Sequence, residues 1–280
     1  MDGEYKTNFS PKGNYMSQPS VLESTFIHAP GIGRSTELRL WQEGATDWQN
    51  YLEGAKSKWS LTTAQRDALT PIVEESVWRL AEEDFLWFAD KLPAGEHWRA
   101  VPVFGHRLAF VDIETTGGNE PEDLTLIGVF DGYKMRQYVR GQNLEDFPEA
   151  IEEAAMLVTF FGTGFDLPFI RRTFPKLEMP QMHVDLCYLL RKLGYRGGLK
   201  KIETQLGIGR TSETTGLSGM DAVRLWYQYL GGSQKALETL LTYNAEDVRN
   251  MSDLLAIGYR KMAMAVRAGE DTQERKQGES

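Results

Sequence analysis

The sequence predicts an α/β fold in which a mixed five-stranded sheet is flanked by helices, with a small all-helical region in front of it. Two observations support this prediction. Residues 21–100 carry apolar residues at the three- and four-residue spacings of amphipathic helices. From residue 101 onward, short apolar runs rich in β-branched and aromatic residues alternate with helical segments. Strands interleaved with helices indicate an α/β domain with a mixed sheet.

The chain is expected to divide into four segments. Residues 1–20 are polar and show no sustained period, so they are predicted to form a flexible tail. The helical region spans 21–100, the α/β domain 101–268, and a second flexible tail 269–280.

Within the helical region, a longer helix is expected at residues 72–88, and an LPAG segment at 92–95 ends the region. Four tryptophans are interpreted as core residues rather than base-stacking platforms: Trp41, Trp48, Trp59 and Trp78.

Five strands are expected at residues 108–111, 124–130, 135–139, 156–161 and 182–184. Asp131-Gly132 between the second and third runs is typical of a hairpin, so these two strands should be antiparallel. Helices are expected at about 144–154, 167–173 and 186–193, and the pattern stays helical from there through residue 268.

Composition excludes several classes of protein. The single cysteine, Cys187, excludes an internal disulfide framework and a cysteine-based zinc site. The first residues lack a basic segment followed by an apolar run, and no apolar run is long enough for a membrane span, so a cytoplasmic protein is expected. The net charge of −9, taken alone, argues against a protein that coats nucleic acid.

Acidic residues follow two of the expected strands. Asp112 and Glu114 end the first strand and, being two residues apart, should point to the same face. They are either exposed at a strand end or paired through a divalent metal, since buried unpaired acids are costly. Asp166 follows the fourth strand and precedes a helix, so a helix N-cap is the alternative to a metal ligand. On a late helix, Tyr243 and Asp247 are four residues apart and share one face.

Together these residues resemble the three exonuclease motifs of the DEDD superfamily, in its DEDDy branch. The motifs are Asp-x-Glu-Thr-Thr-Gly from Asp112, Phe165-Asp166, and Tyr-x-x-x-Asp from Tyr243. Further matching stretches at residues 183–193, 199–208 and 221–247 make the sequence most similar to the YprB-like ribonuclease-H-like proteins. One departure is that members often carry an asparagine before the second-motif Asp, where Phe161 or Gly162 stands here.

The resemblance implies a ribonuclease-H-like fold with two divalent ions, Mg²⁺ or Mn²⁺. It implies Asp112, Glu114, Asp166 and Asp247 as metal ligands, with Tyr243 positioning the water. Two such ions would assist both the attacking and the leaving oxygen of a displacement at phosphorus. Asp185 is assigned to a helix N-cap or to a supporting role behind the ligands.

Nucleic-acid contacts are assigned to Thr115, Thr116, Phe165, Lys200 and Lys201. Residues 171–210 contain nine basic and three acidic side chains, a net charge of +6, so the rest of the chain carries −15. Such a segment could guide phosphates to an acidic site, or it could be a solvated helix face.

A second candidate contact lies in the helical region. Gly31 and Gly33 precede Arg34 and a helix, which is similar to the hairpin of a helix-hairpin-helix element that binds phosphate through backbone amides. The alternative is a tight turn between helices that needs glycine.

The sequence thus predicts a metal-dependent 3′–5′ exonuclease acting on the 3′ ends of single-stranded DNA or RNA and releasing nucleoside 5′-monophosphates. Two alternatives stay open, a non-catalytic nucleic-acid-binding module and a hydrolase of short oligonucleotides. Protein partners are not predicted.

Overall fold

The computed structural model describes residues 20–54 and 58–269. The predicted tails at 1–20 and 269–280 therefore lie almost wholly outside the described residues. The strands are β1 Leu108–Thr115, β2 Leu124–Phe130, β3 Met135–Val139, β4 Met156–Thr159 and β5 Met182–Asp185. The α-helices are α1 Arg34–Gln42, α2 Trp48–Glu53, α3 Thr63–Ala81, α4 Phe85–Lys91, α5 Val101–Phe104, α6 Phe147–Ile151, α7 Asp166–Thr173, α8 Leu186–Lys192, α9 Leu199–Leu206, α10 Gly219–Leu230 and α11 Gln234–Arg267. Short 3₁₀ helices are η1 Ala94–Ala100, η2 Gly105–Arg107, η3 Pro121–Asp123 and η4 Leu144–Asp146.

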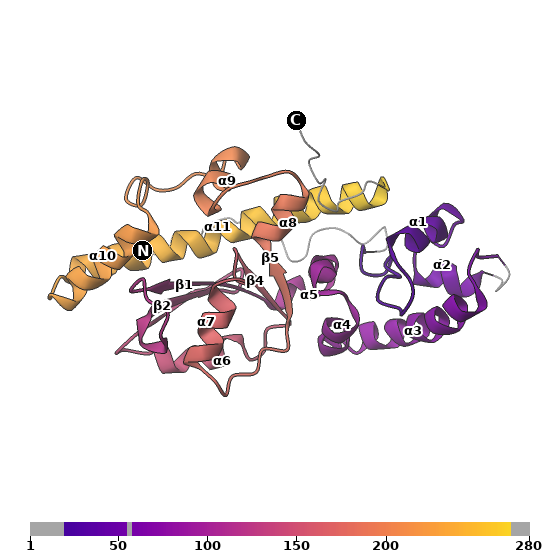
Figure 1. Cartoon of the computed structure of the whole chain (residues 1–280), viewed down its shortest axis with the longest axis horizontal. Helices are drawn as coiled ribbons and strands as arrows, with labels where there is room; N and C mark the ends of the chain where they lie inside the picture. The colour runs from indigo at the N-terminus through magenta and orange to yellow at the C-terminus, as the bar shows by residue number, and fades with distance from the viewer. Residues whose placement is uncertain (1–19, 55–57, 270–280) are drawn as a thin grey trace.

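The five strands form one mixed sheet, as predicted, and their order in it is β3-β2-β1-β4-β5. The pairs β1–β2 and β2–β3 are antiparallel, whereas β1–β4 and β4–β5 are parallel. In Figure 1, α6 and α7 lie on one side of the sheet, and the long helix α11 with α8 to α10 lies on the other. None of the described helices combines the length and hydropathy needed to cross a bilayer.

Alternation along β1 determines which residues face which layer. Val111 and Ile113 pack in the core that contains α7. Phe110 instead belongs to the core that contains α11. Side chains two residues apart in a strand share a face. Asp112 and Glu114 therefore point to the same side as Phe110, toward α11.

A glycine in β2 allows α11 to approach the sheet closely. Gly128 is opposite Asp112 in the β1–β2 register. A Cβ atom at Gly128 would lie 2.1 Å from Oδ1 of Asn244 and 2.8 Å from Cγ2 of Val248, both on α11. Any larger residue here would displace the Asn244 and Val248 side chains, so this glycine allows them to pack directly against β2.

The helical region differs from the prediction in its longest helix. Instead of one helix at 72–88, α3 begins at Thr63 behind a Thr62/Gln65 capping box and ends at Ala81. Glu83 has a φ of 53°, and Asp84 caps the new helix α4 through the backbone N–H of Trp87. The chain therefore turns at residues 82–84, where a left-handed residue and an acidic cap outweigh the continuous apolar spacing.

Three of the four tryptophans interpreted as core residues pack in the interior. Trp48 and Trp59 are buried, and Trp41 packs partly buried against the same core. The prediction is wrong for Trp78, whose side chain is 54% exposed and lies under the Arg79 guanidinium at 4.5 Å. Val77 beside it is also exposed, at 42%, so among the described residues this part of α3 lies at the surface.

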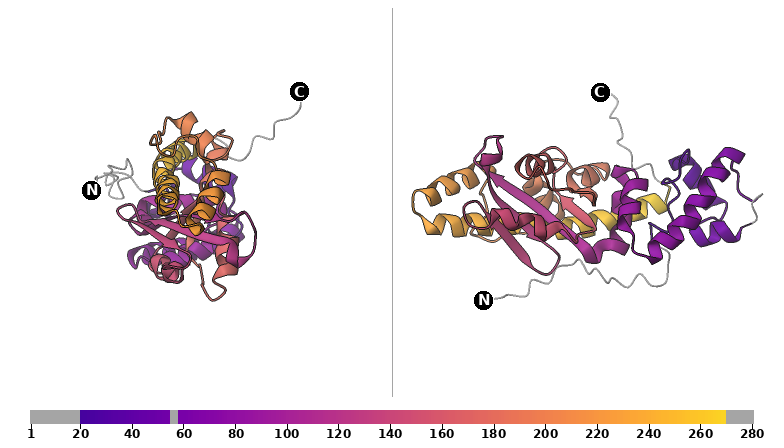
Figure 2. Two further views of the ribbon diagram at one scale, coloured as in Figure 1. Left: turned by 90° about the vertical axis from the view of Figure 1, so that its left-hand side faces the viewer. Right: turned by 90° about the horizontal axis from the view of Figure 1, so that it is seen from below.

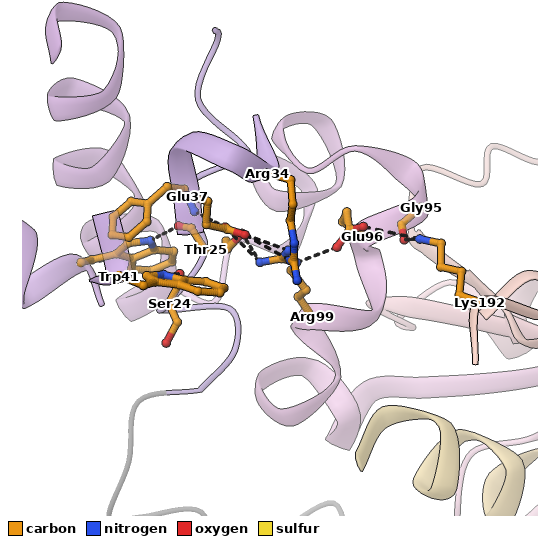
Figure 3. Close-up of polar contacts among 11 residues, drawn as sticks. Ser24, Thr25, Arg34, Glu37, Trp41, Gly95, Glu96, Arg99 and Lys192 are labelled. Carbon is orange, nitrogen blue, oxygen red and sulfur yellow. Dashed lines mark hydrogen bonds and ion pairs between the residues drawn. The ribbon is translucent and has the colours of Figure 1, made fainter. Parts of the chain in front are cut away.

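The helical region lies at one end of the molecule and the sheet at the other, as the two orthogonal views show (Figures 1 and 2). A buried ion-pair network joins α1 to η1, which packs against β5, and Lys192 of α8 contacts η1 from the other side (Figure 3). Arg99 of η1, fully buried, donates to both carboxylate oxygens of Glu37 in α1 at 3.0 Å and to Glu96 at 2.7 Å. Lys192 at the end of α8 donates to the carbonyl of Gly95 at 3.1 Å.

Candidate functional site

Three of the predicted acids converge at the carboxyl end of β1. One carboxylate oxygen from each of Asp112, Glu114 and Asp247 lies within 4.8 Å of the other two. Glu114 and Asp247 are buried and Asp112 is half-buried. Residues from distant parts of the chain thus meet because β1 and α11 pack face to face.

Asp166 adjoins this group without being part of it. It is the first residue of α7, and its Oδ1 accepts a hydrogen bond from the backbone N–H of Ile113 at 3.2 Å. The N-cap of α7 is Phe165 and Asp166 is the first helical residue, so the N-cap interpretation is wrong, although the Asp166 carboxylate also accepts from its own backbone N–H. Asp166 instead joins α7 to β1 beside Asp112, whose pKa its charge helps to raise.

The four acids are electrostatically crowded. Burial raises the pKa of Asp112 and Glu114 well above their usual values, and the neighbouring carboxylates raise it further. Burial also raises the pKa of Asp166 to about 7 and that of Asp247 to about 6, the latter in spite of Arg210 nearby. In the absence of a metal ion, burial and mutual repulsion therefore favour the protonated forms of these acids.

Two side chains that were not predicted as site residues contact the acids. Asn244 of α11 donates from Nδ2 to Oδ2 of Asp112 at 3.0 Å. Arg210 forms an ion pair with Asp247, with Nη1 and Oδ1 2.5 Å apart. Glu203 orients this guanidinium, because it accepts from Nε at 2.6 Å and from Nη2 at 2.8 Å.

The residues fit a divalent cation. Carboxylate oxygens are the ligands that Mg²⁺ and Mn²⁺ prefer. Oδ1 of Asp247 is buried and faces Nη1 of Arg210 across their 2.5 Å ion pair. The neighbouring carboxylates of Asp112, Glu114 and Asp247 disfavour one another's charged forms, and a divalent ion between them would offset that repulsion.

Tyr243 lies one helical turn before Asp247 and contacts Lys200. Lys200 Nζ donates to the Tyr243 hydroxyl at 2.8 Å and lies 4.2 Å from the ring centroid. It also donates to the backbone carbonyl of Leu217. Burial and the nearby carboxylates raise the pKa of Tyr243 further above its usual range, so this phenol stays protonated at neutral pH. Lys200, which was predicted to contact the nucleic-acid strand, thus lies inside the acidic site beside Tyr243.

The remaining residues assigned to nucleic acid lie in different settings. Thr116 donates through Oγ1 to Asp123, and Thr115 Oγ1 accepts from the N–H of Gly117 at 3.1 Å, so both hydroxyls are used within their own loop. Phe165 is 39% exposed directly before Asp166, and Lys201 is exposed on α9.

The glycine turn of the helical region precedes α1, but no helix stands on its other side. Residues 21–31 form turns, so among the described residues the first helix of a helix-hairpin-helix element is missing. Gly33 is the N-cap of α1. Arg34 pairs with Glu37 at 3.3 Å, next to the Arg99 network (Figure 3).

Asp185 caps a helix and also holds a loop. Its Oδ1 accepts from the N–H of Cys187 at 3.0 Å, which caps α8. The same carboxylate accepts from the N–H of Phe161 at 2.9 Å and from that of Thr163 at 3.0 Å. The loop that leads to Asp166 is thereby fixed to the end of β5.

Metal binding to this site should depend on pH. We expect Mn²⁺ to raise the melting temperature strongly at pH 8 and little at pH 5, because below pH 6 the ion must displace protons from Asp166 and Asp247. Thermal melts with and without Mn²⁺ across this range test the expectation. A stabilisation that is as large at pH 5 as at pH 8 would contradict it.

Comparison with protein families gives one match. A family model of the RNase H superfamily matches residues 109–258, more than half of the chain, and the matched range runs from β1 into α11. The structure is also similar to that of the family B DNA polymerase from the hyperthermophilic archaeon Pyrobaculum calidifontis, with a TM-score of 0.45 and 16% identity over 58% of this chain. The match spans 25% of the polymerase chain. No curated protein matches in sequence.

Proposed function

Because the chain belongs to the RNase H superfamily, we propose that it is a metal-dependent 3′–5′ exonuclease of single-stranded DNA or RNA that releases nucleoside 5′-monophosphates. The observation that supports this proposal best is the meeting of Asp112, Glu114 and Asp247 at one end of the sheet. The finer assignment, to the DEDDy branch and to YprB-like proteins, is part of the same proposal and rests on the motif resemblance.

The four acids would hold two Mg²⁺ or Mn²⁺ ions, with Asp112, Glu114 and Asp247 as the central ligands and Asp166 beside them. When bound, such ions activate a water molecule and stabilise the departing 3′ oxygen. Asn244 fixes the orientation of the Asp112 carboxylate through its hydrogen bond. Glu203 and Arg210 do the same for Asp247.

Tyr243 would position the attacking water rather than deprotonate it. Its hydroxyl oxygen accepts from Lys200, which leaves its own proton free to be donated on the side of the acids. A phenol with a pKa raised by burial is a poor base at neutral pH.

Replacing Tyr243 with phenylalanine should therefore lower kcat by roughly 10- to 100-fold, as is usual for residues that orient reacting groups. The pH dependence of kcat should keep its shape, because no titrating base is removed. Steady-state kinetics of Tyr243→Phe between pH 6 and 9.5 test this. Loss of an ionisation in the variant's profile would instead identify Tyr243 as the base.

The activity itself is tested by digesting single- and double-stranded DNA and RNA, labelled at either end, in the presence of Mn²⁺. A ladder that shortens from the 3′ end, releases 5′-monophosphates and disappears with EDTA is expected. Shortening from the 5′ end would contradict the polarity. Stable binding without hydrolysis would favour a non-catalytic binding module, and preference for dinucleotides would favour an oligonucleotide hydrolase.

We further propose residues 101–268 as the nuclease domain and 21–100 as an accessory helical region. We propose that the nucleic-acid strand is contacted by the backbone groups of Thr115 and Thr116, by the ring face of Phe165 and by the side-chain charge of Lys201. Lys200 is proposed to contact it from within the site. A backbone contact at Gly31, Gly33 and Arg34, and a cytoplasmic location, stay predictions.

A further inference from the structure

Two exposed aromatic side chains lie together near the acidic site. Phe161, in the loop from β4 to α7, is 45% exposed, and Tyr188 of α8 is 40% exposed. Their ring centroids are 6.3 Å apart with an interplanar angle of 40°. Large apolar side chains at the surface lose the stabilisation that burial would give, so a pair of them next to a site suggests a ligand.

The backbone of Phe161 is held in an unfavourable conformation. Its φ of 64° lies in the left-handed region, where glycine and asparagine are common and an aromatic residue is rare. Asp185 maintains this conformation by accepting from the N–H groups of both Phe161 and Thr163. Strain that surrounding contacts maintain is concentrated at binding and catalytic sites.

The aromatic pair and the acids lie at the same edge of the sheet. The strands β1, β4 and β5 are parallel, so their carboxyl ends lie side by side. Asp112 and Glu114 end β1, Phe161 follows β4, and Tyr188 is three residues beyond β5. Neighbouring strands are about 4.8 Å apart, so the pair lies about one to two strand spacings from the acids.

A cation completes the pair. The Arg191 guanidinium lies 5.3 Å from the centroid of the Tyr188 ring. Exposed aromatic faces with an adjacent arginine are the combination with which proteins bind single strands, because bases stack on the rings and the cation attracts phosphate.

We propose that Phe161 and Tyr188 form a binding site for an unpaired nucleobase of the strand whose 3′ end lies at the acids. The proposal rests on the proposed function, which it deepens by assigning the contact that selects single strands. A base within a duplex is stacked on its neighbours and does not offer its face to these rings, so duplex ends should bind more weakly.

The test measures binding without hydrolysis, by fluorescence anisotropy of labelled single-stranded oligonucleotides in EDTA. Phe161→Gly removes the ring and relieves the left-handed strain, so its melting temperature should stay within a few degrees of wild type. Phe161→Gly and Tyr188→Ala should each weaken binding about 5- to 100-fold. Tyr133→Ala, which removes an aromatic that is 75% exposed in the β2–β3 turn, is the matched control and should bind like wild type.

An oligonucleotide with abasic sites at its three 3′-terminal positions separates base stacking from a general change of the surface. Wild type should lose affinity for it, and the wild-type and Phe161→Gly proteins should then bind it equally. Equal affinity of wild type and both variants for the intact oligonucleotide would overturn the proposal, even if hydrolysis is observed. Absence of hydrolysis together with the expected affinity losses would refute only the proposed function.

Discussion

Replacing Asp112 with asparagine is expected to lower Mn²⁺-dependent hydrolysis by roughly a thousandfold or more and, in the absence of metal, to raise the melting temperature by a few degrees. The first effect follows because a neutral amide is a poor ligand, and the stabilisation of the transition state by a metal ion amounts to several kcal/mol. The second follows because the raised pKa of Asp112 reflects burial and three neighbouring acids. Asparagine removes that repulsion and still offers an oxygen to Asn244.

The sign of the stability effect depends on pH. An acid whose pKa is raised in the folded state destabilises the protein as the pH rises through the interval between its unfolded and folded pKa values. The gain in Asp112→Asn should therefore be largest at pH 8 and small at pH 4. Melting curves in EDTA at both pH values and a gel assay with Mn²⁺ measure the two effects.

Glu149→Gln is a suitable control, because it removes an exposed acid on α6, on the other side of the sheet. It should change neither hydrolysis nor the pH dependence of melting. More than a tenth of wild-type kcat in Asp112→Asn would exclude the carboxylate group as the reacting centre. A lower melting temperature of Asp112→Asn at pH 8 would show that the Asp112 carboxylate contributes more through its contacts than it costs through repulsion.

The parts of the fold that local patterns determine could be predicted from the sequence. Each strand has an apolar run bounded by turn residues, and the two-residue spacing of Asp112 and Glu114 fixes their common face. The four-residue spacing of Tyr243 and Asp247 likewise fixes one face of α11. That these faces meet in one site does not follow from the local patterns, and it was implied by the resemblance to a known superfamily.

Contacts that depend on the distance between layers could not be predicted. A Cβ atom at Gly128 would collide with the Asn244 amide that donates to Asp112, and the presence of a glycine in the sequence does not by itself reveal this contact. Arg210 looked like one of nine basic residues in a positive segment, but it is paired with Glu203 and Asp247. Part of the positive charge of residues 171–210 therefore pairs with acidic side chains within the site.

A single buried guanidinium holds the junction between α1, the turns before it and η1, the 3₁₀ helix that packs against β5. Arg99 donates to Thr25 at 2.8 Å, to both oxygens of Glu37 and to Glu96. Glu37 also accepts from the backbone N–H of Phe26 at 2.8 Å. Residues from the turns before α1, from α1 itself and from η1 are thereby joined in one network.

Arg99→Met should destabilise the protein by about 3–5 kcal/mol, because the fully buried Glu37 carboxylate loses the guanidinium that contacts both of its oxygens and keeps the 3.3 Å ion pair with the partly exposed Arg34. Urea denaturation followed by tryptophan fluorescence measures this loss, since Trp41 and Trp48 lie in the helical region. The matched control is Arg79→Met. Arg79 is a partly exposed residue of α3 that pairs with Glu75 and Asp84, so its replacement should shift the urea midpoint only slightly.

A double variant separates an unpaired charge from lost packing. Arg99→Met/Glu37→Gln keeps acceptors for Thr25 and Phe26 while removing the buried charge, so it should recover at least half of the stability that Arg99→Met loses. If the double variant is as unstable as Arg99→Met, the guanidinium stabilises the junction by its contacts rather than its charge. If Arg99→Met unfolds at the wild-type urea concentration, the network does not hold the junction.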